Sequence, residues 1–155
     1  MRVNWKKLLL YTAIPLVVGG LSALLSGNMS AAYMDYVRPP LSPPGWVFAV
    51  VWPILYALMG YASYLVAEAP GDKKKPLTLY AVQLAVNFLW SIVFFRFGSV
   101  GGALILLILL WGLVLLTIRS FADVSEKASD LLIPYILWLS FALYLNLGIF
   151  MLNQL

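Results

Sequence analysis

The chain has 155 residues, a net charge of +4, and neither Cys nor His. Its hydrophobic fraction of 63% and its mean hydropathy of +0.94 exceed the values of water-soluble domains. Without Cys and His there are no disulfides, thiol nucleophiles or imidazole bases, and the commonest ligands of metals and haem iron are missing. The composition therefore predicts an integral membrane protein with no metal site, no nucleic-acid partner and no separate soluble catalytic module.

Five apolar stretches are each long enough to cross the hydrocarbon core of a bilayer. They cover residues 8–25, 46–67, 77–95, 100–118 and 131–152. We expect one all-α transmembrane domain over residues 1–155, built as a bundle of five helices with one long loop between the first and second helices.

The charges predict an orientation in the cell membrane. Eight Lys and Arg residues lie at the N-terminus and in the second and fourth connections, whereas the opposite side carries only Arg38 and Arg96. Because cytoplasmic loops carry the excess of basic residues, the N-terminus should be cytoplasmic and the C-terminus outside. All six acidic residues lie in loops or at helix ends, which argues against ion pumps and charged-ring channels.

The long first connection, residues 26–45, is followed directly by the second helix and contains the sequence RPPLSPPGW. Proline restricts the backbone, so this segment could form a stiff lid over the mouth of the bundle. The prolines could equally serve only to start the second helix. The lid residues would be Arg38, Pro39, Pro40, Leu41, Pro43, Pro44 and Trp46.

Aromatic and amide side chains recur at helical spacing in three of the five stretches, where residues three, four or seven apart share a face. The candidate ligand-binding residues are Trp52, Tyr56, Gln83, Asn87, Trp90, Phe94, Trp138, Ala142, Leu145 and Asn146. An amide facing lipid would be unpaired, so the three amides should point inward. Hydrogen bonding between helices is the favoured explanation for Asn146, and for Gln83 and Asn87 it is as well supported as ligand contact.

Two tryptophans suggest the shape of a site. Trp52 and Trp138 lie about two turns inside their helices, and the small Ala142 follows Trp138 by one turn. A large residue beside a small one would form a slot for a flat, apolar, polycyclic ligand. Aromatic core packing without a ligand explains the same spacing.

Three segments, RPPLSPPGWVFAVVWPILYALMGYASYL, QLAVNFLWSIVFF and PYILWLSFALYLN, resemble the TspO/MBR family. This family comprises the tryptophan-rich sensory proteins of bacteria and the translocator proteins, or peripheral benzodiazepine receptors, of mitochondria. The resemblance covers nearly the whole chain. It implies a five-helix bundle, often a homodimer, with a pocket beneath the first loop for protoporphyrin and other tetrapyrroles, and in animals for cholesterol and synthetic drugs.

The resemblance also implies roles for single residues. Trp52 and Trp138 match the pair associated with binding and light-dependent breakdown of protoporphyrin, which makes them candidate photochemical residues. Gln83 and Asn87 match the third-helix amides, and Ala142 matches a small residue that affects ligand affinity.

One departure from the animal proteins favours a bacterial role. Leu147 and Met151 stand where those proteins carry the Tyr and Arg of a cholesterol motif. No resident cofactor is implied. Protoporphyrin IX would be a ligand or substrate, and it suits the chain better than haem because the strong axial ligands His and Cys are absent.

Several functions stay open on the sequence alone. The chain could be a receptor or sensor for tetrapyrroles, an enzyme that degrades protoporphyrin with light and oxygen, a transporter of porphyrin or sterol, or a structural subunit without a ligand. Since the stretches contain no acid, base or thiol, any reaction must draw its reactivity from the excited porphyrin.

Overall fold

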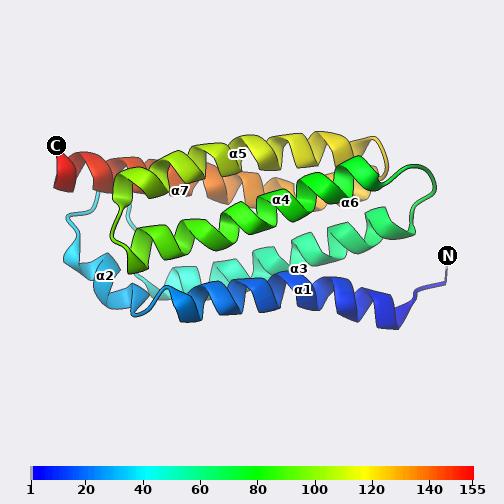
Figure 1. The fold of residues 1–155 in the computed structure, drawn as a ribbon, viewed down its shortest axis with the longest axis horizontal. Helices are drawn as coiled ribbons and strands as arrows, with labels where there is room; N and C mark the ends of the chain where they lie inside the picture. Colours follow the sequence, from blue (N-terminus) through cyan, green and yellow to red (C-terminus); the bar gives the residue numbers. More distant parts are fainter. Residues whose placement is uncertain (1) are drawn as a thin grey trace.

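The computed structural model describes residues 2–155, and long helices packed side by side make up most of it (Figure 1). The long helices are α1 (Trp5–Leu25), α3 (Trp46–Glu68), α4 (Lys74–Ser91), α5 (Val100–Ala122) and α7 (Ile133–Gln154). The shorter elements are α2 (Met29–Asp35), α6 (Glu126–Leu131) and the π-helical turn η1 (Ile92–Arg96), which continues α4. No strand occurs within residues 2–155, so the prediction of an all-α fold is confirmed.

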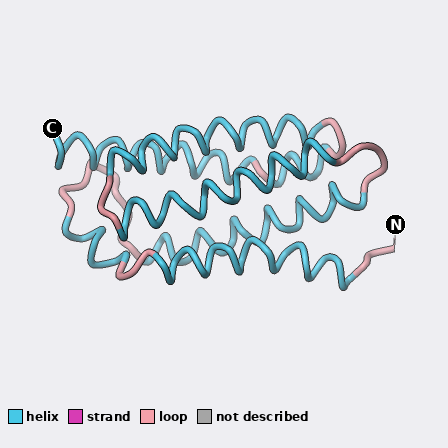
Figure 2. Tube along the Cα trace, in the orientation of Figure 1, coloured by secondary structure: helices cyan, strands magenta, loops and turns pink. Residues whose placement is uncertain are grey.

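Five helical segments are long and apolar enough to cross a membrane, as the sequence predicts. They have 21, 23, 23, 23 and 29 residues, and the last includes both α6 and α7. Each is longer than the corresponding apolar stretch because polar residues such as Lys6 and Lys74 extend the helix ends, where long basic side chains reach water. The loops lie at the two ends of the bundle (Figure 2).

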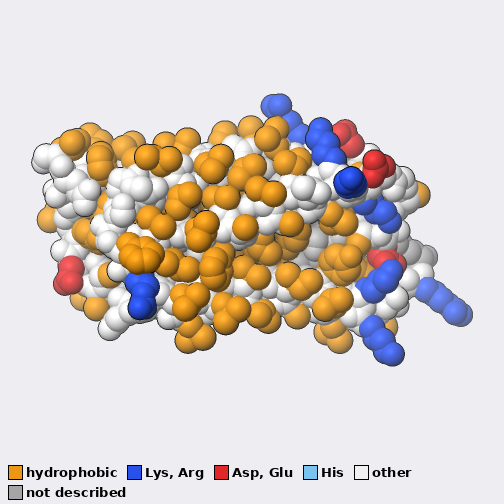
Figure 3. All heavy atoms as spheres, viewed as in Figure 1, with side chains coloured by type: hydrophobic (Ala, Val, Ile, Leu, Met, Phe, Trp, Pro, Cys, Tyr) orange, Lys and Arg blue, Asp and Glu red, His pale blue; other side chains and the backbone are white. Residues whose placement is uncertain are grey.

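The surface separates charged ends from an apolar middle. Figure 3 shows most Lys and Arg side chains at the end where α1 begins, and hydrophobic side chains over the visible middle. Lys7 of α1 pairs with Glu68 of α3 at this charged end, at 3.1 Å. Large apolar side chains such as Leu9, Leu24 and Ile105 are exposed, which is the expected arrangement for a surface in contact with lipid.

The connection between the first two spans differs from the expected loop. Residues 29–35 of it form α2, whose first turn is capped by the Asn28 side chain, which accepts a hydrogen bond from the Ala31 amide. A helix of seven residues is too short to produce a periodic pattern in the sequence. The proline-rich part begins only after α2 has ended, and α3 then begins at Trp46.

Candidate ligand-binding cavity

A cavity of about 260 Å³ lies inside the bundle, at the end opposite the Lys-rich one. Its walls come from the C-terminal parts of α1, α4 and α7 together with η1, and from the N-terminal part of α3, while α2 covers it. The walls are mainly apolar, and the few polar groups are hydroxyls and side-chain amides. No Asp, Glu, Lys or Arg in residues 2–155 is buried, so the bundle interior has no charge to attract an ion.

Eight of the ten predicted ligand-binding residues line this cavity. They are Trp52, Tyr56, Asn87, Trp90, Phe94, Ala142, Leu145 and Asn146. Gln83 and Trp138 do not line it. The face predicted on each helix therefore points toward one common space, although not every residue of each face reaches it.

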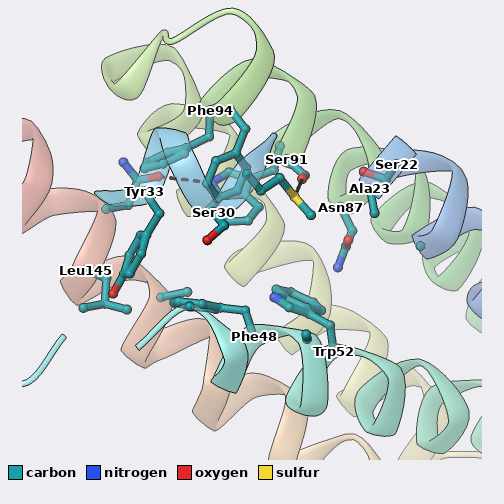
Figure 4. A pocket seen from close by; sticks show the side chains of 18 of the residues that line it. Ser22, Ala23, Ser30, Tyr33, Phe48, Trp52, Asn87, Ser91, Phe94 and Leu145 are labelled. Carbon is teal, nitrogen blue, oxygen red and sulfur yellow. Dashed lines mark hydrogen bonds between the residues drawn. The ribbon is translucent and has the colours of Figure 1, made fainter. Parts of the chain in front are cut away.

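Trp52 stands at the centre of the aromatic wall. Its ring stacks on that of Tyr56 with a centroid distance of 5.5 Å, and it lies 6.4 Å from Trp90. Figure 4 shows Trp52 and Phe48 along one side of the cavity, with Phe94 and Ser91 on the other side. The space between them has aromatic surfaces suited to a flat apolar ligand.

Trp138 lies behind this wall. Its ring meets Phe48 edge-on at a centroid distance of 5.7 Å, and Phe48 lines the cavity itself. The indole Nε1 of Trp138 is buried without a hydrogen-bond partner among residues 2–155. Trp138 therefore contacts a residue of the cavity wall without lining the cavity, so Trp52 and Trp138 do not stand on opposite sides of it. Sequence reasoning missed Phe48, although it precedes Trp52 by four residues and so shares its helix face.

The π-helical turn η1 contributes two neighbouring rings. Phe94 and Phe95 both line the cavity, with ring centroids 4.7 Å apart. Consecutive residues of an α-helix point in directions about 100° apart, so an extra residue in the turn alters which side chains face inward. The sequence predicted only Phe94, because a regular helical period does not anticipate such a turn.

The amides of α4 form a continuous hydrogen-bond chain with two tyrosines. The Tyr56 hydroxyl donates to Asn87 Oδ1 at 2.8 Å, and Asn87 Nδ2 donates to the Tyr135 hydroxyl at 2.7 Å. Tyr135 in turn donates to Gln83 Oε1 at 2.8 Å. Asn87 thus joins α4 to α3 and α7 while also lining the cavity. Gln83, whose Nε2 also donates to Met59 Sδ at 4.0 Å, joins the same helices without lining the cavity.

Asn146 connects another pair of helices to α7. Its Oδ1 accepts from the Trp90 indole nitrogen at 3.0 Å, and its Nδ2 donates to the carbonyl oxygen of Val100 at 3.1 Å. The expected interhelical hydrogen bonds of Asn146 are therefore present. They also fix the indole of Trp90 as part of the cavity wall.

The cover of the cavity comes from α2. None of the seven predicted lid residues lines the cavity, whereas Met29, Ser30 and Tyr33 of α2 do. The proline-rich segment contacts α2 and not the cavity. The Tyr33 hydroxyl donates to the carbonyl oxygen of Pro43 at 2.6 Å, and the Arg38 guanidinium lies 4.8 Å from the centre of the Tyr33 ring.

Residues 37–40 form a strap that is fastened to the last turns of α7. The Asn153 side chain both accepts from the Val37 amide at 3.0 Å and donates to the Val37 carbonyl at 2.7 Å. The Tyr144 hydroxyl donates to the carbonyl oxygen of Pro40 at 2.6 Å. Pro39 packs against Gly148, where an added Cβ would come within 2.7 Å of the proline ring. The strap therefore holds α2 in place from its C-terminal side.

We expect Asn153→Leu to loosen the strap and to speed ligand release. It removes both bonds to Val37, and two hydrogen bonds contribute about 1–3 kcal/mol, so the dissociation rate should rise by about 5- to 160-fold. Gln154→Leu is the matched control, since Gln154 is an exposed neighbour whose side chain forms no hydrogen bond within residues 2–155. Stopped-flow measurement of dissociation checks the result, and equal rates for both variants would make the strap a simple connector.

Comparison with known proteins gives a consistent set of relatives. The profile of the TspO/MBR family matches residues 11–152. The chain is 37% identical to the translocator protein of Bos taurus over 99% of its own length and 94% of the relative's. It is 43% identical to the tryptophan-rich protein TspO of Chlorobaculum tepidum over 78% of each chain, and 33% identical to the tryptophan-rich sensory protein of Cereibacter sphaeroides over 99% and 95%.

Proposed function

The chain belongs to the TspO/MBR family, and on that premise we propose that it is a membrane receptor that binds a tetrapyrrole, protoporphyrin IX, in the cavity beside Trp52. The observation that carries the proposal is the composition of the cavity wall, in which Trp52, Tyr56, Trp90 and Phe94 surround an uncharged space within the bundle. Large aromatic faces favour stacking with a flat macrocycle. Metal-free porphyrin suits this site because the chain has no His or Cys to bind iron.

The size of the cavity adds a condition. Its volume of about 260 Å³ is below the roughly 300–1,000 Å³ of cavities that hold drug-sized ligands. A macrocycle would therefore need the cover to move outward before it could enter. The helix α2 and its strap are the elements that would have to move, since α2 covers the cavity and the two are fastened by hydrogen bonds of Tyr33, Tyr144 and Asn153.

Titration of the purified protein with protoporphyrin IX, followed by tryptophan fluorescence in the dark, tests the proposal. We expect saturable quenching that falls when Trp52 is changed to Phe. Trp111→Phe is the control, because the Trp111 indole donates to Ser140 at 3.0 Å and does not line the cavity. Quenching that never saturates, or that is unaffected by either substitution, would contradict binding in this cavity.

A second candidate activity is the light- and oxygen-dependent degradation of bound protoporphyrin. It is supported by the Trp52–Tyr56 stack, which places an electron-rich indole and a hydrogen-bonded phenol at the cavity surface. Within residues 2–155 no Asp, Glu, Lys or Arg is buried to act as acid or base, so the energy for the reaction would come from the photoexcited ligand. Illuminating the saturated complex and following the loss of porphyrin absorbance distinguishes a receptor from a photochemical enzyme.

We also propose the orientation given by the basic residues, with the N-terminus cytoplasmic, the C-terminus outside the cell membrane, and a homodimer as the assembly. The cavity then opens in the outer half of the bilayer, opposite the Lys-rich end. A reporter fused after Leu155 that is active only in the cytoplasm would contradict this orientation. Chemical cross-linking in native membranes would test the dimer.

A further inference from the structure

Gly19 of α1 lies against the ring of Tyr56. A Cβ at position 19 would come within 2.7 Å of both Cδ2 and Cζ of that ring, which is closer than real Cβ contacts. Both residues line the cavity. The tyrosine ring therefore occupies the space that any larger residue at position 19 would need.

The ring of Tyr56 is confined from two other directions. It stacks on Trp52 with centroids 5.5 Å apart, and its hydroxyl donates to Asn87 Oδ1 at 2.8 Å. A tyrosine side chain has only two rotatable bonds before its hydroxyl, so the ring cannot shift far without losing one of these contacts. Gly19, Trp52 and Asn87 together fix where this part of the cavity wall stands.

We propose that Gly19 is a positioning residue that determines the size of the flat ligand that the cavity admits, by leaving Tyr56 room to stand back against α1. This inference rests on the proposed function, since it concerns selectivity at the same site. A methyl group at position 19 displaces the Tyr56 ring from α1, breaks its bond to Asn87, and narrows the space beside Trp52. Large macrocycles then lose more affinity than small aromatic ligands do.

Two other glycines provide matched controls. Gly20 is the next residue of α1, and a Cβ there would meet nothing within 4 Å. At Gly60 an added Cβ would lie 2.7 Å from Thr12 Cα, so Gly60→Ala disturbs the packing of α1 on α3 at a residue that does not line the cavity. Alanine is the better helix former, so Gly20→Ala should leave the fold as stable as before or more so.

The experiment compares Gly19→Ala, Gly20→Ala and Gly60→Ala with the unmodified chain, using protoporphyrin IX and pyrene as a large and a small flat probe. Overpacking a well-filled site costs about 1–3 kcal/mol, so Gly19→Ala should weaken protoporphyrin binding by about 5- to 160-fold. The same variant should change pyrene binding by less than about threefold, because the smaller probe does not need the lost space. Gly20→Ala should bind both probes like the unmodified chain.

A double-mutant cycle separates positioning of Tyr56 from general damage. In a Tyr56→Leu background the ring is gone, so adding Gly19→Ala should have no further effect on protoporphyrin affinity. Near-UV circular dichroism without ligand supplies an independent signal, because moving Tyr56 off Trp52 should change the spectrum in Gly19→Ala and leave it unchanged in Gly20→Ala. This signal tests Gly19 even if the chain does not bind protoporphyrin, an outcome that would overturn the proposed function alone.

Two results would overturn the role of Gly19. One is equal protoporphyrin affinity and equal spectra for Gly19→Ala and Gly20→Ala. The other is a loss of large-probe selectivity in Gly60→Ala as great as in Gly19→Ala, since the effect would then follow from helix packing in general. Thermal unfolding of each variant in detergent shows whether that variant is folded under the conditions of the binding measurement.

Discussion

Replacing Asn87 with Leu should destabilise the folded bundle by about 1–3 kcal/mol, the cost of leaving a buried polar group without its partner. Asn87 is 3% exposed, and its two bonds tie α4 to Tyr56 of α3 and to Tyr135 of α7. Leucine has the same branched arrangement of side-chain heavy atoms, so the main loss is of hydrogen bonds rather than of side-chain contacts. The Tyr56 hydroxyl would then have no acceptor, while Tyr135 would still donate to Gln83.

Unfolding in mixed detergent micelles measures this change in the free energy of unfolding. A second substitution tests whether the unpaired Tyr56 hydroxyl causes it. Adding Tyr56→Phe to Asn87→Leu removes the unpaired hydroxyl, so the double variant should recover part of the lost stability. Single interhelical hydrogen bonds in membrane proteins contribute about 0.6 kcal/mol on average and up to about 1.7 kcal/mol, so the loss of both Asn87 bonds agrees with the expected value. If Asn87→Leu unfolds like the unmodified chain, the amide is available for a ligand and does not hold the helices together.

The inward direction of the three amides could be predicted because only the outward direction, toward lipid, carries a large free-energy cost. An unpaired amide in lipid is expensive whatever the fold, so Gln83, Asn87 and Asn146 had to point into the bundle. The partners could not be predicted in the same way. Tyr135 and Trp90 become partners only through the rotation of α7 and α4, which depends on packing along the whole length of both helices.

Trp138 shows the limit of helical spacing. Periodicity assigns a residue to a face about 100° wide, and it does not tell which edge of that face meets the cavity. Ala142 and Leu145 reach the cavity, whereas Trp138 turns toward Phe48 at the flank of α7. Whether Trp138 acts on a ligand stays a prediction, and its contact with the cavity wall is through Phe48.

The cover was the least predictable part of the site. The four prolines of residues 38–46 predict a stiff backbone, but the stiffness of a segment does not predict which residues it contacts. The contacts that decide its position lie more than a hundred residues away, at Tyr144 and Asn153. In the sequence, only Gly148 and Asn153 hint at a contact between α7 and this segment, and neither residue identifies its partner without the fold.

The photochemical prediction follows from the different positions of the two tryptophans. Trp52→Phe should weaken protoporphyrin binding by on the order of 1 kcal/mol, because an aromatic ring remains but its area is smaller. On illumination the degradation rate at saturating ligand should fall by about tenfold or more, equivalent to at least about 1.4 kcal/mol in the barrier. An indole that only stacks would lose affinity without losing rate at saturation, so a fall in that rate shows that the indole contributes to the reaction step itself.

Trp138→Phe is the natural comparison, because Trp138 packs against Phe48 of the cavity wall but does not line the cavity. We expect its binding and its degradation rate to stay within about twofold of the unmodified chain, since Trp138 does not line the cavity and an aromatic ring remains at this position. A larger loss in Trp138→Phe than in Trp52→Phe would place the ligand on the far side of Phe48, which would then have to swing aside. Unchanged binding and degradation in both variants would make the two tryptophans packing residues, and the reactive groups would have to be sought along the wall formed by Trp90 and Phe94.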